Sequence, residues 1–221
     1  MRKPILILAI LMLSLFVKGQ RYLSDPSTGK PYHTGVYSEI QGSPLLFEDW
    51  KTSHATDKYG TTFLDVLIRF DLYTNKFYYN YQGATYTFVT DISEFEIFPF
   101  IVDTSTKMVF KKGFTVPGKL TPDKYVQVLT EGKVTAIKYL FKSIDETTEY
   151  NVPGKVKTFV SRLLYFFIKD GDITSQKPNS KLLAELLKDK WPTIETYMKE
   201  NSLSAKNEDD CIKAINYYNS L

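Results

Sequence analysis

Apolar and polar residues alternate between residues 61 and 170 in a way that predicts short β-strands. Glu94–Phe98 places Phe95 and Ile97 on one face and two glutamates on the other, which is the period-two pattern of a half-buried strand. Other runs rich in aromatic and β-branched residues predict further strands at Phe63–Phe70, Lys76–Tyr81, Ala84–Val89, Met108–Lys112, Tyr125–Thr130, Val134–Phe141 and Thr158–Ile168. Most of the chain is therefore expected to be β-structure.

Turn residues join these runs into hairpins. Gln82-Gly83 separates two of them, Glu131-Gly132 lies at the centre of the hairpin Lys124–Tyr139, and Asp170-Gly171 ends the last strand. Glycine tolerates positive φ without a Cβ clash, so each pair suits a tight turn. The pattern favours an antiparallel meander of hairpins, with a sandwich or a partial barrel as possible forms of the sheet.

The pattern becomes helical after about Gln176. Asn179 or Ser180 can cap a first helix, Pro192 can lie in the first turn of a second, and Asn207 can cap a third. Short helices are marginal alone, so these are expected to pack on the sheet or on each other. Their apolar stripes contain Leu182, Leu183, Leu186, Leu187, Ile194, Tyr197, Met198, Cys211, Ala214, Ile215 and Tyr218. The expected fold class is α+β, mainly β, with a small C-terminal helical subdomain.

The first 19 residues have the pattern of a secretory signal peptide. Arg2 and Lys3 precede an apolar run from Pro4 to Val17, which is shorter than the roughly 20 residues of a membrane-spanning helix. We expect cleavage after Gly19, with an uncleaved N-terminal anchor as the alternative. The expected organisation is a signal peptide at 1–19, a β-rich domain with an irregular N-terminal segment at 20–175, and a helical tail packed on that domain at 176–221.

Removal of residues 1–19 changes the charge balance. The whole chain has 28 basic and 25 acidic residues, and Arg2, Lys3 and Lys18 lie in the removed segment, so the mature chain is formally neutral. Binding to nucleic acid needs a net or clustered positive surface. We therefore expect no nucleic-acid partner. We also expect no membrane span once the signal peptide is cleaved.

Few residues form a recognisable chemical site. His33 and His54 are the only histidines, and neither has a carboxylate or thiolate at a familiar ligand spacing, so no metal is expected. Gly113–Lys119 matches the start of a phosphate-binding loop, but Leu120 stands where a Ser or Thr must reach the metal ion; we interpret the stretch as a β-turn and expect no cofactor. Cys211, the only cysteine, is interpreted as a small buried residue, with an intermolecular disulfide or a reactive thiol as alternatives.

Carboxylates offer the main catalytic alternative. Glu94 and Glu96 share one face of a strand, and Glu48-Asp49 precedes Trp50. Glycoside hydrolysis uses two carboxylates held several ångströms apart. Charges that alternate along a strand more often form its solvated side, so catalytic residues stay unassigned.

Aromatic residues supply the candidates for ligand binding. Phe77, Tyr78, Tyr79 and Tyr81 cluster in one predicted strand, and Trp50 can stack on a sugar or a peptide. Successive residues of a strand point to opposite faces, so part of the cluster could face a ligand. The alternative is a sheet buried on both sides, with Trp50 as an anchor for its loop.

Four stretches of the chain resemble a group of exported Gram-negative bacterial proteins without an assigned biochemical function. They are Gly42–Trp50, Val66–Lys76, Tyr125–Lys133 and the closing Asn216–Asn219. The resemblance implies an envelope or extracellular setting and supplies no catalytic residues.

The leading hypothesis is therefore an exported, non-catalytic binding or interaction module of the cell envelope, located in the periplasm or outside the cell. Its expected partner is an envelope protein, a peptide or a glycan. The alternatives are a carboxylate-based hydrolase of glycans or peptides and a carrier of an apolar ligand in a β-barrel-like cavity. An exposed aromatic patch or open sheet edge would favour the first, convergent acids in a cleft the second, and a closed apolar cavity the third.

Overall fold

A computed structural model describes residues 29–31, 37–100, 106–148, 150 and 154–221, and the strands in these residues form one large mixed sheet that does not close. The fold is mainly β with a small C-terminal helical region, which confirms the fold class predicted above. The strands are β1 (Gly29–Pro31), β2 (Ile40–Gln41), β3 (Lys51–Asp57), β4 (Thr62–Asp71), β5 (Lys76–Tyr81), β6 (Ala84–Phe88), β7 (Ile92–Ile97), β8 (Met108–Lys111), β9 (Val126–Thr130), β10 (Val134–Thr147), β11 (Val156–Lys169) and β12 (Asp172–Thr174).

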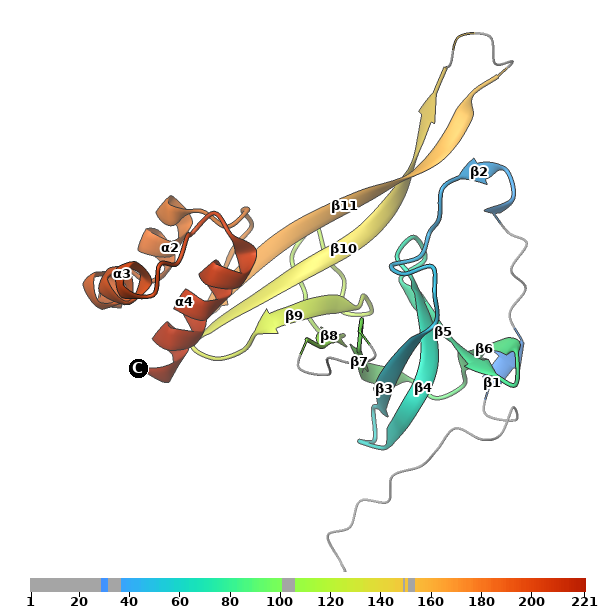
Figure 1. Ribbon diagram of the computed structural model, residues 1–221, viewed down its shortest axis with the longest axis horizontal. Helices are drawn as coiled ribbons and strands as arrows, with labels where there is room; N and C mark the ends of the chain where they lie inside the picture. Colours follow the sequence, from blue (N-terminus) through green and yellow to red (C-terminus); the bar gives the residue numbers. More distant parts are fainter. Residues whose placement is uncertain (1–28, 32–36, 101–105, 149, 151–153) are drawn as a thin grey trace, which may run out of the picture.

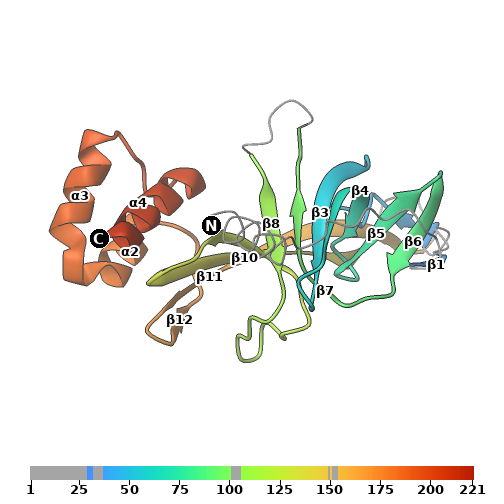
Figure 2. The ribbon, with the colours of Figure 1, turned by 90° about the horizontal axis from the view of Figure 1, so that it is seen from below.

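The order of strands across the sheet is β1-β6-β5-β4-β3-β7-β8-β9-β10-β11-β12, and every neighbouring pair on this path is antiparallel. The strand β2 lies off the path and pairs in parallel with β11. Figure 1 shows the long β10–β11 hairpin running past the shorter strands β3 to β9. Figure 2 shows the helices at one end of the molecule and β1 with β6 at the other.

Each strand predicted from the alternation of residues is present, but the pattern predicts no strand at β3, which falls in the expected irregular N-terminal segment. This strand lies between β4 and β7 in the sheet. Its buried residues Ser53 and Ala55 are small, and Ser53 donates a hydrogen bond of 2.6 Å to the carbonyl oxygen of Glu96. Small or polar core residues give no apolar alternation, which explains why the pattern missed a central strand.

Aromatic side chains fill the concave side of the short strands. Phe95 stacks on Phe110, with 4.9 Å between ring centroids, and Phe70 lies edge-on to both at 5.2 Å. Phe77 and Tyr125 extend this cluster, and all five side chains are buried. The sheet therefore curls around a packed aromatic core.

The helical region begins as the cap residues predicted. Asn179 accepts a hydrogen bond of 2.9 Å from the amide of Leu182, and Asn207 accepts one of 3.1 Å from the amide of Asp210. Pro192 lies in the first turn of its helix. The helices are α2 (Ser180–Leu186), the 3₁₀ turn η4 (Lys188–Lys190), α3 (Trp191–Glu200) and α4 (Glu208–Ser220).

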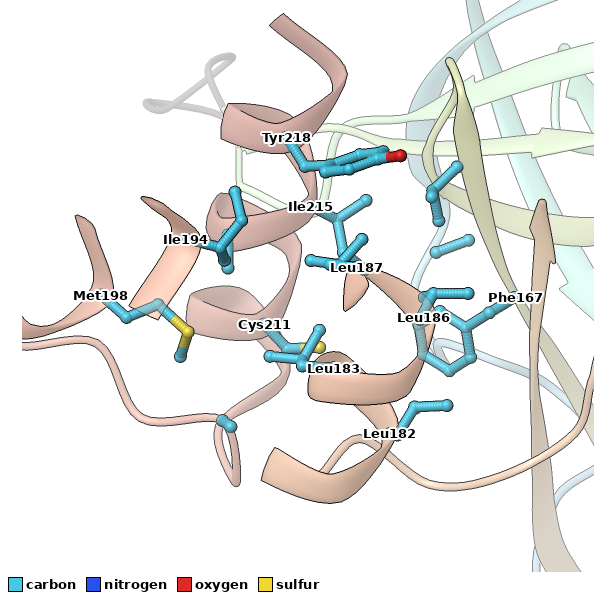
Figure 3. Close-up of a cluster of buried hydrophobic side chains, with 14 residues drawn as sticks. Phe167, Leu182, Leu183, Leu186, Leu187, Ile194, Met198, Cys211, Ile215 and Tyr218 are labelled. Carbon is cyan, nitrogen blue, oxygen red and sulfur yellow. The ribbon is translucent and has the colours of Figure 1, made fainter. Parts of the chain in front are cut away.

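The helices share a second core with the base of the β10–β11 hairpin. Leu183, Leu187 and Ile215 are fully buried and belong to the same cluster as Ala136 of β10 and Phe167 of β11. Figure 3 shows the leucines of α2 and the stripe of α4 converging on Phe167. The helical region thus covers one face of the hairpin at its base.

Candidate binding surface on the β10–β11 hairpin

The β10–β11 hairpin is unusually long and regular. Its strands pair over fourteen consecutive positions, from Val134 opposite Lys169 to Thr147 opposite Val156, without a register shift. The neighbouring strand β9 pairs only with Ala136–Lys138 of β10. Between its base and the pairing of β2 with Lys157 and Thr158, the hairpin is therefore a two-stranded ribbon (Figure 1).

One edge of β11 is covered by other strands only at its two ends. The strand β12 pairs with Phe167–Lys169, and β2 pairs with Lys157 and Thr158. Among the described residues, no strand pairs with Phe159–Phe166 on this side. We call Phe159–Phe166 the open edge.

The turn between β11 and β12 shows which N–H and C=O groups of the open edge point outward, away from β10. Asp170 and Gly171 have φ of 52° and 87°, the positive values of a type I′ turn, in which Lys169 and Asp172 exchange backbone hydrogen bonds. Every second residue of β11 directs its N–H and C=O to the same side. Those of Phe159, Ser161, Leu163 and Tyr165 therefore point to the open edge.

A contact on the other side of the hairpin gives the same assignment. Lys142 of β10 lies opposite Ser161, and its N–H donates to the carbonyl oxygen of Leu72, away from β11. Residues 142 and 161 hence form a pair that does not exchange backbone hydrogen bonds. The backbone groups of Ser161 must then point outward as well.

The side chains along the open edge lack the features that usually block strand addition. Edges of this kind are protected by charge, proline or bulges, but this stretch contains no proline and no bulge. Its single charged side chain, Arg162, donates to both carboxylate oxygens of Asp145 at 3.1 and 2.7 Å. Leu163, near the middle, is 40% exposed.

Contacts at both ends of the open edge hold it in place. The ring of Phe159 lies edge-on to Tyr37 at 5.4 Å and to Tyr73 at 5.5 Å. At the other end the hydroxyl of Tyr165 donates to Glu208 of α4. Burial and this hydrogen bond raise the pKa of Tyr165, so the hydroxyl remains a donor at neutral pH.

The aromatic residues proposed as ligand contacts are mostly buried. Phe77 and Tyr79 belong to the aromatic core, Tyr81 packs against it, and Tyr78, on the opposite face of β5, is only 4% exposed. Trp50 is half-buried, and the guanidinium of Arg69 lies 4.6 Å from its ring centroid. That stacking fits the anchoring alternative for Trp50.

One of these aromatic residues borders a cavity. A cavity of about 390 Å³ lies between β5, β6 and the start of β7, lined by Phe77, Phe88, Ile92 and Tyr125 together with polar residues. Tyr125 is buried, and its hydroxyl donates to the carbonyl oxygen of Ile92. Aromatic rings fill the interior of the curled strands. The cavity is therefore only a shallow apolar recess at one end of these strands.

Of the carboxylates considered for catalysis, Glu94 and Glu96 each have their own lysine partner. Glu94 pairs with Lys111 at 3.3 Å and Glu96 with Lys107 at 2.6 Å, whereas Glu48 and Asp49 are exposed. A further set of contacts joins His54 to Glu96 at 3.8 Å and to Asp65 at 3.5 Å.

The remaining chemical predictions concern Cys211 and the two histidines. Cys211 is fully buried, and burial, with a contribution from Glu208, raises the pKa of its thiol to about 12, so the interpretation as a buried residue is confirmed. Asp57, the nearest carboxylate to His54 in sequence, instead accepts hydrogen bonds from the amides of Tyr59 and Thr61. His33 lies outside the described residues. Within the described ranges no three His, Cys, Asp or Glu side chains are grouped as metal ligands.

Comparison with protein-family models, curated proteins and solved structures found no match to this chain. In the part of the chain that the structure describes, no helix has the length and apolar character required to span a bilayer.

Proposed function

We propose that this chain is an exported, non-catalytic interaction module that binds another component of a bacterial cell envelope through its β10–β11 hairpin. The export part of the proposal rests on residues 1–19, whose pattern is that of a cleavable signal peptide. The envelope setting rests on the resemblance described above. Sequencing of the exported chain should find Gln20 at its N-terminus.

One observation carries the binding role. The open edge is a regular strand edge, held at both ends by its own chain and lined by an exposed Leu163. Soluble proteins usually shield such an edge, because its unpaired N–H and C=O groups attract other strands. A surface that is both rigid and left accessible suits recognition of a partner.

Site-specific photo-crosslinking in an envelope extract tests this role. A benzophenone amino acid is placed at Leu163 in the mature chain and, in a control, at Tyr59, which is 78% exposed in the turn after β3. We expect a discrete crosslinked product from position 163 and none from position 59. Equal products at both positions, or none at either, would contradict binding through the hairpin.

A hydrolysis assay addresses the catalytic alternative. The mature chain is incubated with cell-wall glycans and with peptides, and product release is measured. We expect no turnover. Turnover that disappears in Glu94→Gln or Glu96→Gln would replace the interaction module with a carboxylate hydrolase.

The apolar recess beside Phe77 favours a second candidate function, transport of a small apolar ligand. Its volume of about 390 Å³ falls in the range of small-molecule sites. Fluorescence titration with an environment-sensitive naphthalene dye, compared between the mature chain and Val89→Trp at the lip of the recess, tests this role. Saturable binding that the substitution abolishes would support it, and equal fluorescence from both chains would exclude the recess.

A further inference from the structure

We propose that the open edge binds an extended segment of a partner polypeptide as an added β-strand. This inference rests on the proposed interaction function and names its mode and its ligand class. The ligand is a peptide of about six to eight residues, without net charge, whose alternate side chains are apolar.

The backbone of β11 supplies the first reason for a peptide ligand. Phe159, Ser161, Leu163 and Tyr165 direct N–H and C=O groups outward, at the spacing of a β-ladder. Only another extended backbone can pair with such a row of alternating donors and acceptors. This side of β11 already pairs with β12 in the antiparallel direction and with β2 in the parallel direction.

The chain's own strands set the length of the ligand. The open edge covers residues 159–166, which span about 26 Å at roughly 3.3 Å per residue. A strand that continued further would meet β12 at Phe167 or, at the other end, β2 at Thr158 and Gly42, which lies beside the carbonyl oxygen of Phe159. As far as the described residues extend, this stretch is therefore an unpaired slot closed at both ends.

A second copy of the same chain does not fit this slot by edge-to-edge pairing. Its β11 has fourteen residues and carries β12 on the very edge that would have to pair. In an antiparallel arrangement, β12 of each copy would occupy the path of β11 of the other. The occupant is instead a segment short enough to end before it reaches β12 or β2.

The side chains beside the slot indicate the composition of the ligand. Leu163 lies on the same face as Ser161 and Tyr165, so a ligand side chain opposite it meets an apolar contact. On the other face, Arg162 lies between Val160 and Leu164, and its charge is already paired with Asp145. Among the side chains of the open edge itself, Arg162 is the only charged one, so the edge carries no unpaired charge to attract a charged ligand.

Peptide selection combined with amide exchange tests the proposal on the full mature chain. A phage library of random heptapeptides is selected on the immobilised chain, and the enriched peptides are synthesised. We expect uncharged sequences with alternating apolar residues. In NMR exchange measurements, the amides of Ser161, Leu163 and Tyr165 should exchange quickly in the free chain and at least tenfold more slowly with peptide, whereas those of Arg162 and Leu164 should be slow throughout.

A matched pair of variants tests the backbone contact. Ser161→Pro removes an outward N–H and should weaken peptide binding at least tenfold, whereas Ser161→Ala keeps the N–H and should bind as the parent does. Enriched peptides that leave the three outward amides unprotected, or a selection that enriches none, would overturn the strand-addition proposal. This exchange measurement uses the unaltered chain and stands even where the proline variant does not fold.

The two proposals fail separately. A crosslink at Leu163 to an envelope glycan or lipid would support the interaction function and overturn the peptide ligand. Peptides that protect the outward amides, together with no crosslink in the envelope extract, would support strand addition and overturn the proposed envelope partner.

Discussion

The Nζ atom of Lys138 on β10 lies 2.7 Å from Oε1 of Glu208 in the first turn of α4. The second carboxylate oxygen of Glu208 accepts a hydrogen bond from Tyr165 on β11. One helix residue therefore joins both strands of the hairpin to the helical region. The same carboxylate lies at the positive end of the α4 dipole, which favours its negative charge.

Replacement of this carboxylate should loosen the helical region from the hairpin. Glu208→Gln removes the charge that pairs with Lys138 and weakens the acceptor for Tyr165, so we expect a loss of about 1–3 kcal/mol in the free energy of unfolding, measured by urea denaturation. Asp209→Asn is the control, because Asp209 is exposed in the same helical turn. An equal loss of unfolding free energy in both variants would mean that Glu208 stabilises the chain only through the helix dipole, and would contradict the contacts with Lys138 and Tyr165.

Gly132 and Asn219 form a second contact between the sheet and α4. The side chain of Asn219 accepts from the amide of Val134 at 2.8 Å and donates to its carbonyl oxygen at 2.9 Å. A Cβ atom on Gly132, whose φ is +156°, would lie 2.7 Å from the end of this side chain. Gly132→Ala should therefore lower the free energy of unfolding by about 1–3 kcal/mol.

Two comparisons test this clash. Gly118 has φ of +71°, a different backbone region from that of Gly132, and nothing lies within 4 Å of a Cβ added there, so Gly118→Ala should lose about 1 kcal/mol from backbone strain alone. Asn219→Ala should lose about 1–3 kcal/mol through its hydrogen bonds. In the double variant of Gly132 and Asn219 the losses should be less than additive, and additive losses would contradict a direct contact.

The thiol of Cys211 should be inert in the folded chain. Burial raises its pKa to about 12, so at pH 7 to 9 the native thiol remains protonated and inaccessible to solvent. An aromatic disulfide reagent should label the chain only after guanidinium unfolds it, and the native chain should run as a monomer on non-reducing gels. Rapid labelling of the native chain at pH 8 would instead revive the reactive-thiol alternative.

Stability should fall in acid because of Asp189. The Lys169 ammonium donates to Asp189 at 2.6 Å, and this hydrogen bond, with a further one from Tyr218, holds the pKa of Asp189 below its ordinary value of 3.8. A lowered folded-state pKa stabilises the native state above pH 3.8, and this contribution disappears as the pH falls through the folded value.

The expected size of this contribution is about 0.5 kcal/mol, because Asp189 is largely exposed and the pair is screened by solvent. Asp189→Asn should be less stable than the parent at pH 7, and the difference should vanish by pH 2 in urea denaturation. Asp170→Asn, at an exposed residue of the nearby turn, controls for the loss of one surface charge. A difference that grows in acid would reverse the assigned sign.

Local patterns predicted the elements of this fold well where each signal lay within a few residues. The caps Asn179 and Asn207, and the alternation around Phe95, all behave as their residue types indicate. The strand β3 escaped detection because its buried positions Ser53 and Ala55 are small or polar.

The candidate surface was harder to foresee, because an open edge is defined by which strands do not pair. Nothing in the residues around Leu163 shows that β12 is only three residues long, or that β2 arrives from the N-terminal part of the chain. The resemblance carried by the closing Asn216–Asn219 indicates no role for these residues, whereas in the structure the side chain of Asn219 binds the backbone of Val134. The aromatic cluster at Phe77 was visible in the sequence, but its burial depends on the curl of the whole sheet.

The parallel pairing of β2 with β11 also bears on the order of folding. Ile40 and Lys157 are far apart in sequence, so closing the loop between them is entropically expensive and should come after the local hairpins have formed. The segment around β2 is synthesised early, but it can pair only after β11 has been synthesised. During that interval the whole edge of β11 from Val156 to Phe166 is unoccupied by the chain's own strands, and folding intermediates should be the species most prone to aggregate.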